Sequence, residues 1–310
     1  MKEALLPLIS RGSAATSSSK RTDLCVSGVQ TASGVADGDN EKVDEEDDAV
    51  SKYKEASMSS TIDDLAKEQC GFRAMVLGWA SSHPRVQFTA IINIENGPGE
   101  GALPSAEYSH AIETLNSLTN VRTIGYVPTT WCTRNLTSVL DDIAAYSFWG
   151  EYDTSLAVHG IFVDETPTQY TPDYVSYLQA ISHAVLDSPG LRDDYIVHNP
   201  GALPDSRYFE HAAPEDAAFV HADLTVVFEN SFTNWSTQGT ELAEATQSYD
   251  RQKLALFLHS VPDLTTNETE TTLRQLLAVG HSVWLTVTPD YTEFDAFLPV
   301  FIDSLAALLG

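Results

Sequence analysis

The sequence predicts an α/β fold with a parallel sheet, because strand-like and helix-like segments alternate from Phe72 to the C-terminus. The strand-like segments are short apolar runs rich in β-branched and aromatic residues. Two architectures fit this alternation, a closed eight-stranded barrel and an open doubly wound sheet. A second observation, polar side chains at the carboxyl ends of the strand-like segments, is typical of the active site of a barrel.

Seven segments are expected to be strands, and a helix-like stretch or a long connection follows each of them. The expected strands are Val86–Asn93, Val121–Pro128, Ala157–Asp164, Tyr195–Asn199, Leu224–Glu229, Leu254–His259 and Val283–Thr288. Among the helix-like stretches, Ser138–Trp149 and Phe294–Leu308 repeat apolar residues at the spacing of a one-faced helix.

A barrel of eight strands needs one strand more than these seven. The clearest candidate before Phe72 is Ala4–Ile9, and Phe72–Ala80 would then be the helix that follows it. The residues in between would form an insertion after the first strand, so the closure of the barrel depends on this short N-terminal segment.

The segment from about Gly12 to Asp63 is rich in Ser, Gly, Asp and Glu, and it nearly lacks large aromatic residues. Such a composition cannot bury enough apolar surface to offset the entropy lost on ordering. We therefore expect residues 1–70 to be a mostly disordered acidic segment that includes the candidate first strand. Residues 71–310 are expected to form a single barrel domain.

The overall charge restricts the choice of partners. The 310 residues carry a formal net charge of -27, from 44 acidic and 17 basic residues. This charge repels phosphate backbones, so nucleic acid is not expected as a partner, whereas a polycation would be attracted. The sequence has no stretch long enough to span a membrane and no clear signal peptide. We expect a monomer.

Polar residues follow or end most of the expected strands. One such residue carries little information, because every strand must exit to solvent. Several carboxylates and amides at the same end of one barrel are typical of an active site. The candidate site residues are Asn93, Tyr126, Asp164, Glu165, Asn199, Glu229, Asn230 and His259.

Three of these residues are carboxylates, which suits glycoside hydrolysis by two facing carboxyl groups. Asp164 and Glu165 are adjacent, and adjacent residues on an extended strand point to opposite faces. We therefore expect them to diverge, with Glu229 as the partner of one of them across the cleft. The competing interpretation is that Asp164 or Glu165 caps a helix or forms a salt bridge.

The same three carboxylates could hold a divalent cation, as in enolase-like barrels. Such a site also needs a Lys or His base, and the only basic residues at the strand ends are His198 and His259. A single His on a strand is more often part of the core than catalytic. We therefore expect neither a metal nor a cofactor.

Many short motifs together resemble the spherulin-4 family of fungal cell-surface proteins, in order and in spacing. They are His83-Pro84, Phe88–Asn93, Asn96-Gly97-Pro98-Gly99, Asn120–Val127, Asp142-Ile143 with Tyr146, Gly160–Pro167, Asn199-Pro200-Gly201 and Val226–Asn230. One departure is Ile94, which stands where the family has Pro after Asn93.

The resemblance implies a (β/α)8 TIM-type barrel and an extracellular or cell-surface location. It also implies the activity of glycoside hydrolase family 135, the endo-cleavage of α-1,4-linked N-acetylgalactosamine in galactosaminogalactan. The acidic catalytic residues of the family look as if they map onto Asp164, Glu165 and Glu229. That polymer becomes partly cationic when it is deacetylated, which suits the acidic chain.

The sequence therefore predicts a glycoside hydrolase acting on an amino-sugar polysaccharide. Glu229 and either Asp164 or Glu165 would form the catalytic pair, and the third carboxylate would tune their pKa values or bind substrate. The expected substrate-binding residues are Asn93, Tyr126, Asn199, Asn230 and His259. The alternative is a non-catalytic protein that binds cell-wall polysaccharide or has a structural role on a barrel scaffold, which a missing first strand would favour.

Overall fold

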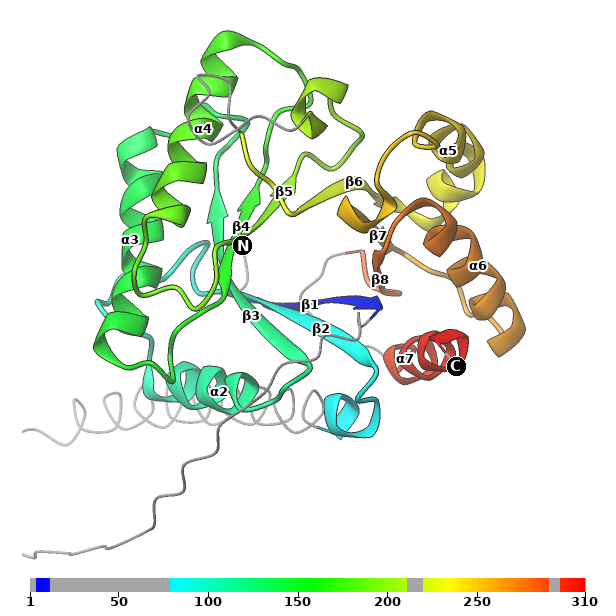
Figure 1. Ribbon diagram of the computed structural model, residues 1–310. Coiled ribbons are helices and arrows are strands. Elements are labelled where there is room, and N and C mark those ends of the chain that lie inside the picture. The colour runs from blue at the N-terminus through cyan, green and yellow to red at the C-terminus, as the bar shows by residue number, and fades with distance from the viewer. Residues whose placement is uncertain (1–3, 12–77, 211–219, 290–295, 310) are drawn as a thin grey trace, which may run out of the picture. The chain divides into compact units, whose positions relative to one another are not determined.

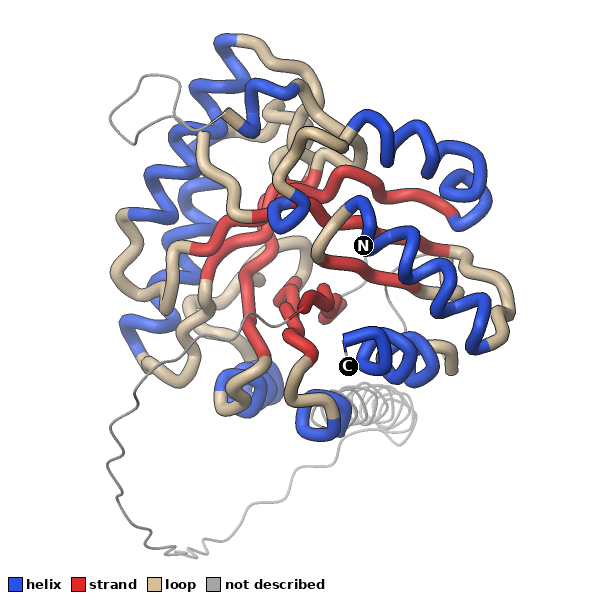
Figure 2. The backbone as a smooth tube through the Cα atoms, turned by 45° about the vertical axis from the view of Figure 1, so that its right-hand side comes forward, coloured by secondary structure: helices blue, strands red, loops and turns tan. Residues whose placement is uncertain are grey.

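The computed structural model describes residues 4–11, 78–210, 220–289 and 296–309. Their strands form one closed barrel in chain order, β1 to β8, with the helices around the outside (Figures 1 and 2). The expected acidic segment and most of the expected helix Phe72–Ala80 lie outside the described residues. The described chain is helical from residue 78 to residue 82. No helix of the described part is long and apolar enough to cross a membrane.

Four of the seven expected strands have the predicted bounds, two differ at one end, and the last differs at both ends. The strands are β2 (Val86–Asn93), β3 (Val121–Pro128), β4 (Gly160–Asp164), β5 (Tyr195–Asn199), β6 (Leu224–Ser231), β7 (Leu254–His259) and β8 (Ser282–Leu285). Strand β4 begins at Gly160 instead of Ala157. The residues Ala157 and Val158 are buried, as their apolar pattern indicates, but they are not paired as a strand. Strand β8 ends early, because the Thr288 N–H bonds the Thr286 hydroxyl and turns the chain.

The eighth strand is β1 (Ala4–Arg11), which lies between β2 and β8 and closes the ring. It runs antiparallel to both neighbours, whereas β2 to β8 are parallel. A strict (β/α)8 barrel would have eight parallel strands. The long connection from Gly12 to Arg85 explains how the direction can differ, because no short crossover dictates it.

Besides the helical residues 78–82, six helices of the described part of the chain pack around the strands, and side-chain caps begin most of them. They are α2 (Ala106–Asn116), α3 (Leu136–Tyr152), α4 (Pro172–Leu186), α5 (Phe232–Ala245), α6 (Thr266–Val279) and α7 (Leu298–Leu309). Ser105, Asn135, Thr171, Ser231 and Thr265 each accept a hydrogen bond from a backbone N–H of the first turn. Short 3₁₀ turns lie at Ser206–Phe209 and Arg251–Lys253.

The inner face of the ring is aromatic at mid-height. Tyr126 of β3 stacks on Phe162 of β4, with ring centroids 6.1 Å apart, and Phe162 stacks on Phe257 of β7 at 6.3 Å. The intervening Val127, Ile161 and Val163 belong to a separate core cluster under α2, α3 and α4. Because side chains alternate along a strand, Asp164 shares the inner face with Phe162.

An irregularity in β6 determines which way Glu229 faces. Val226 pairs with Ala255 of β7, but the next paired residue is Phe228, opposite Leu256, so Val227 is extra. This bulge moves Glu229 into register with Phe257, an inner-face residue, instead of with Leu258. A one-residue shift of register exchanges the two faces of a strand, so the bulge directs Glu229 into the barrel.

Candidate active site at the carboxyl end of the barrel

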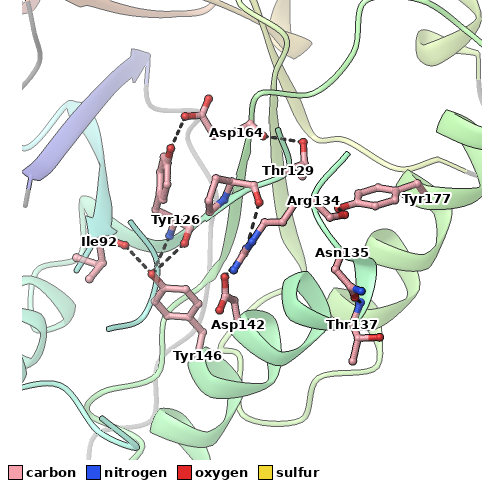
Figure 3. A network of polar contacts seen from close by, with 11 residues as sticks. Ile92, Tyr126, Thr129, Arg134, Asn135, Thr137, Asp142, Tyr146, Asp164 and Tyr177 are labelled. Carbon is pink, nitrogen blue, oxygen red and sulfur yellow. Dashed lines mark hydrogen bonds and ion pairs between the residues drawn. The ribbon is translucent and has the colours of Figure 1, made fainter. Parts of the chain in front are cut away.

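Three donors surround the Asp164 carboxylate at the end of β4. The Tyr126 hydroxyl donates to Oδ2 at 2.6 Å. The backbone N–H of Glu165 and Nδ2 of Asn199 donate to Oδ1 at 2.8 and 2.7 Å. Figure 3 shows the Tyr126 contact, and β3, β4 and β5 each supply one of these side chains. The three bonds fix the orientation of the carboxylate.

Asn199 links the Asp164 carboxylate to that of Glu229, because its Nδ2 also donates to Glu229 Oε2 at 2.6 Å. Since both distances start at one nitrogen, Asp164 Oδ1 and Glu229 Oε2 lie at most about 5.3 Å apart. The two carboxylates therefore face one another across a single amide, and both amide hydrogens are used.

The backbone after β5 connects the Asn199 amide to the backbone of Glu229 in β6. The Gly201 N–H donates to Asn199 Oδ1 at 3.0 Å, and the Glu229 N–H donates to the Gly201 carbonyl at 2.9 Å. Gly201 has a φ of 68°, in the left-handed region where Gly is at ease. The motif Asn199-Pro200-Gly201 therefore positions both the amide and the second carboxylate.

Glu165 does not follow the alternation that was expected of it. Strand β4 ends at Asp164, and Glu165 has a φ of 55°, so its backbone is left-handed instead of extended. The expected divergence of Glu165 from Asp164 assumed an extended backbone, which Glu165 does not have. The charge of Glu165 is close enough to help raise the pKa of Tyr126.

Burial and hydrogen bonding act in opposite directions on Asp164. Burial raises the pKa of its carboxyl above the ordinary value, while the bonds from Tyr126, the Glu165 N–H and Asn199 oppose that rise. The pKa of Tyr126 is raised well above its ordinary value, first by burial and then by the charge of Asp164. Tyr126 therefore stays protonated and acts as a donor.

Tyr146 of α3 supports Tyr126 from the outer side of the barrel (Figure 3). Its hydroxyl accepts a bond from the Tyr126 N–H and lies 3.1 and 2.9 Å from the carbonyl oxygens of Tyr126 and Ile92. Its ring lies against Gly125, where an added Cβ would come within 2.6 Å of the ring. This fully buried side chain joins β2 to β3 at the layer of the site.

A loop between β3 and α3, which we call the 129–135 loop, is bonded to the backbone carbonyl oxygens of Asp164 and Glu165. The Thr129 N–H and hydroxyl both bond the Asp164 carbonyl oxygen, and the hydroxyl also lies 2.8 Å from the Glu165 carbonyl oxygen. The Trp131 N–H donates to that same Glu165 oxygen at 2.7 Å. These bonds hold Glu165 in its left-handed conformation.

The remaining expected site residues, Asn93, Asn230 and His259, differ in their surroundings. Asn93 is 6% exposed, and its buried Oδ1 makes no hydrogen bond in the described part of the chain. The Asn230 oxygen instead accepts from the Ser231 N–H and from Asn234, at the start of α5. His259 contacts the Ser260 hydroxyl at 2.9 Å.

The histidine on β5 lies apart from these carboxylates. His198 is buried, alternation places it on the face of β5 opposite Asn199, and burial lowers its pKa to about 4. Among the described residues, no group of three or more His, Cys, Asp or Glu side chains is arranged to hold a metal ion.

Sequence reasoning did not assign roles to Thr129, Gly201 or Tyr146. Thr129 directly follows a strand that ends in Pro128, and this position was the only signal for it. Gly201 and Tyr146 belong to motifs that were noted, but their contacts depend on which strands are neighbours. Ile94 differs from the family's Pro with a visible consequence, since its N–H donates to the Gly97 carbonyl at 2.8 Å.

Comparison with known proteins identifies relatives of this barrel. The family described as spherulation-specific family 4 matches residues 74–305. The crystal structure of Aspergillus clavatus Sph3 in complex with GalNAc is similar, with a TM-score of 0.69 and 36% sequence identity. The similarity covers 75% of this chain and 91% of that chain. No curated protein matches the chain.

The hydrogen bond from Tyr126 predicts a measurable change at Asp164. Replacing Tyr126 by Phe removes a donor that favours the ionised carboxylate, so the pKa of Asp164 should rise further above its ordinary value. Carboxyl carbon NMR across a pH titration measures this directly. The matched control is Tyr152→Phe, which removes a hydroxyl from an exposed ring at the last residue of α3 and should leave Asp164 unchanged. An unchanged Asp164 pKa in Tyr126→Phe would contradict the assignment.

Proposed function

Because the chain belongs to spherulation-specific family 4, we propose that it is a glycoside hydrolase that cleaves an amino-sugar polysaccharide between Asp164 and Glu229. The observation that carries the proposal is the pair of carboxylates bridged by Asn199 at the carboxyl end of the barrel. Glycoside hydrolysis needs one carboxyl group to protonate the leaving oxygen and a second to act on the sugar carbon.

Asp164 is the nucleophile in this proposal. Its three donors stabilise the charged form and hold one orientation, which a nucleophile requires. Glu229 is the general acid and base. Glu165 contributes a nearby negative charge, which favours the positive charge that develops on the sugar in the transition state.

The reaction would proceed in two steps. Asp164 attacks the anomeric carbon while Glu229 gives its proton to the leaving oxygen, so that a glycosyl ester forms and the glycosidic bond breaks. Glu229 then takes a proton from water, the water oxygen attacks the same carbon, and the Asp164 carboxylate is released. Asn93, Tyr126, Asn199, Asn230 and His259 are the proposed contacts to the sugar, with Asn93 supplying a buried acceptor.

The substrate class follows from the relative and from the charge of the chain. The Sph3 structure contains GalNAc, and the resemblance noted from the motifs implies an α-1,4-linked N-acetylgalactosamine polymer. A partly deacetylated form of that polymer is cationic and would be concentrated by a chain of net charge -27. We propose an extracellular or cell-surface location, as in the family, and a monomer.

The alternative of a non-catalytic scaffold protein was tied to an open barrel. In the described residues β1 closes the ring, so the observation that would favour this alternative is not found. A protein of that kind would bind polysaccharide without releasing new reducing ends, and the first experiment below separates the two.

Removing either carboxylate should stop cleavage. Glu229→Gln and Asp164→Asn keep the size of the side chains but remove the acid and the nucleophile, so the rate of reducing-end release should fall by about a thousandfold or more. The matched control is Glu241→Gln, an exposed carboxylate on α5, which should keep full activity. Full cleavage by Glu229→Gln, with unchanged melting temperatures, would overturn the proposal.

The short separation of the two carboxylates predicts retention of configuration at the anomeric carbon. Retaining enzymes hold their carboxyl groups about 5 to 5.5 Å apart, whereas inverting enzymes leave about 6.5 to 9.5 Å for a water. Proton NMR of the first products, recorded before mutarotation, identifies the anomer. An inverted product would show that Asp164 is not the nucleophile.

The acidic surface predicts that binding depends on salt. Raising the salt concentration from about 0.05 to about 0.5 M should weaken binding of a partly deacetylated polymer, because surface charges are screened. The fully acetylated polymer is the matched neutral control, and its affinity should change little. Equal salt dependence for the two polymers would argue against attraction by charge.

A further inference from the structure

We propose that Trp131 is a sugar-stacking platform, whose indole ring binds the apolar face of a pyranose ring on the Asp164–Glu165 side of the cleavage point. The inference deepens the proposed function and rests on it, since it assigns a binding subsite to a residue next to the candidate active site. It starts from the different degrees of packing and exposure of the aromatic side chains that lie near the strand ends.

Most of these aromatic side chains pack against another ring or against the barrel core. Trp149 is fully buried with its ring 4.6 Å from that of Tyr146, and Trp235 is buried with its ring 5.5 Å from that of Phe228. Phe232 packs against the barrel core. These side chains cannot receive a sugar without a change in the core.

Tyr170 is also engaged, between the Tyr208 ring at 4.8 Å and the Arg207 guanidinium at 4.2 Å. Trp131 differs from all of them. Its side chain is 55% exposed, and it makes no ring contact in the described part of the chain. It therefore presents a large apolar surface to solvent.

The position of Trp131 ties this surface to the proposed site. Its backbone N–H donates to the Glu165 carbonyl at 2.7 Å, and two residues earlier the Thr129 N–H donates to the Asp164 carbonyl at 3.0 Å. The backbone of Trp131 therefore lies beside that of Asp164 and Glu165. An exposed aromatic residue in this position can contact a polymer that extends past Asp164.

The backbone around Trp131 is held in a strained conformation. Thr130, Trp131 and Cys132 have φ values of 49°, 52° and 61°, three consecutive residues in the left-handed region without a Gly. Such strain persists only where the surroundings impose it, and it gathers at ligand-binding and catalytic sites.

The 129–135 loop supplies those surroundings (Figure 3). Arg134 donates to the Pro128 carbonyl and pairs with Asp142 of α3 at 2.6 Å, while the Tyr177 hydroxyl of α4 bonds the Arg134 carbonyl at 2.8 Å. A loop fastened on both sides presents its exposed ring in a fixed place. Less of the binding energy is then lost to ordering when a ligand binds.

The chemistry of an aromatic ring suits the proposed substrate. A galactose-type pyranose carries several C–H groups on one face, and these pack against an electron-rich ring such as indole. An amino sugar without its acetyl group would add attraction between its ammonium and the same ring. The platform therefore accepts both acetylated and deacetylated sugars in one polymer.

The test is a binding experiment in the full-length chain. Binding of α-1,4-linked N-acetylgalactosamine oligosaccharides is measured by calorimetry in the Glu229→Gln background, so that the ligand is not consumed. Adding Trp131→Ala should weaken binding by about tenfold, and Trp131→Phe should restore most of it. In the enzyme with Glu229 intact, Trp131→Ala should raise KM for the polymer and change kcat by less than about twofold.

Tyr152→Ala is the matched control. Tyr152 is 65% exposed and lies at the last residue of α3, at the opposite end of the barrel, so its loss should not change binding. Equal affinity of the Trp131→Ala and parent proteins would overturn the inference, as would a parent that binds none of these sugars. If the chain binds in a Trp131-dependent way but cleaves nothing, the platform stands and the proposed hydrolysis fails.

Discussion

The amide of Asn199 is the contact on which the candidate site depends. Two carboxylates a few ångströms apart repel one another, and a donor placed between them offsets that repulsion. Asn199 Nδ2 bonds both Asp164 and Glu229, so it fixes their separation as well as their orientation. The amide is held in turn through its oxygen by the Gly201 N–H, and the Gly201 carbonyl holds the Glu229 backbone. A single loop after β5 thus sets the geometry of both acidic groups.

The barrel brings these groups together by two different routes. Asp164 and Asn199 are register partners on neighbouring parallel strands, so simple alternation places them on the same inner face. Glu229 reaches that face only because Val227 is extra in β6. Without the bulge, Glu229 would align with Leu258 and face the helices. The bulge therefore turns the Glu229 carboxylate toward that of Asp164.

Much of this arrangement could be predicted from the sequence, because it follows from local patterns. The strands β2, β3, β5 and β7 have the bounds that their apolar runs indicate, and β3 and β5 supply Tyr126 and Asn199. Strand β4 begins later than expected but ends at Asp164 as its pattern indicates. What could not be predicted depends on exceptions to those patterns. The left-handed backbone of Glu165 invalidates the alternation argument, and it is imposed by Thr129 and Trp131 from another loop. The oxygen of the Asn230 side chain accepts bonds from the Ser231 N–H and from Asn234 of α5, which the strand pattern did not indicate.

The cost of an ionised Asp164 explains why so much of the structure serves one carboxylate. Burial alone would favour the neutral acid, which cannot act as a nucleophile. Three hydrogen bonds oppose that effect, and each donor is positioned by a separate part of the fold: Tyr126 through Tyr146 of α3, Asn199 through Gly201, and the Glu165 N–H through the 129–135 loop. That loop also carries the exposed Trp131. The strained segment 130–132 therefore both bonds the Glu165 backbone and presents the Trp131 ring. Under the proposed mechanism the same loop positions the nucleophile Asp164 and the sugar at Trp131, so a change in its backbone should affect both.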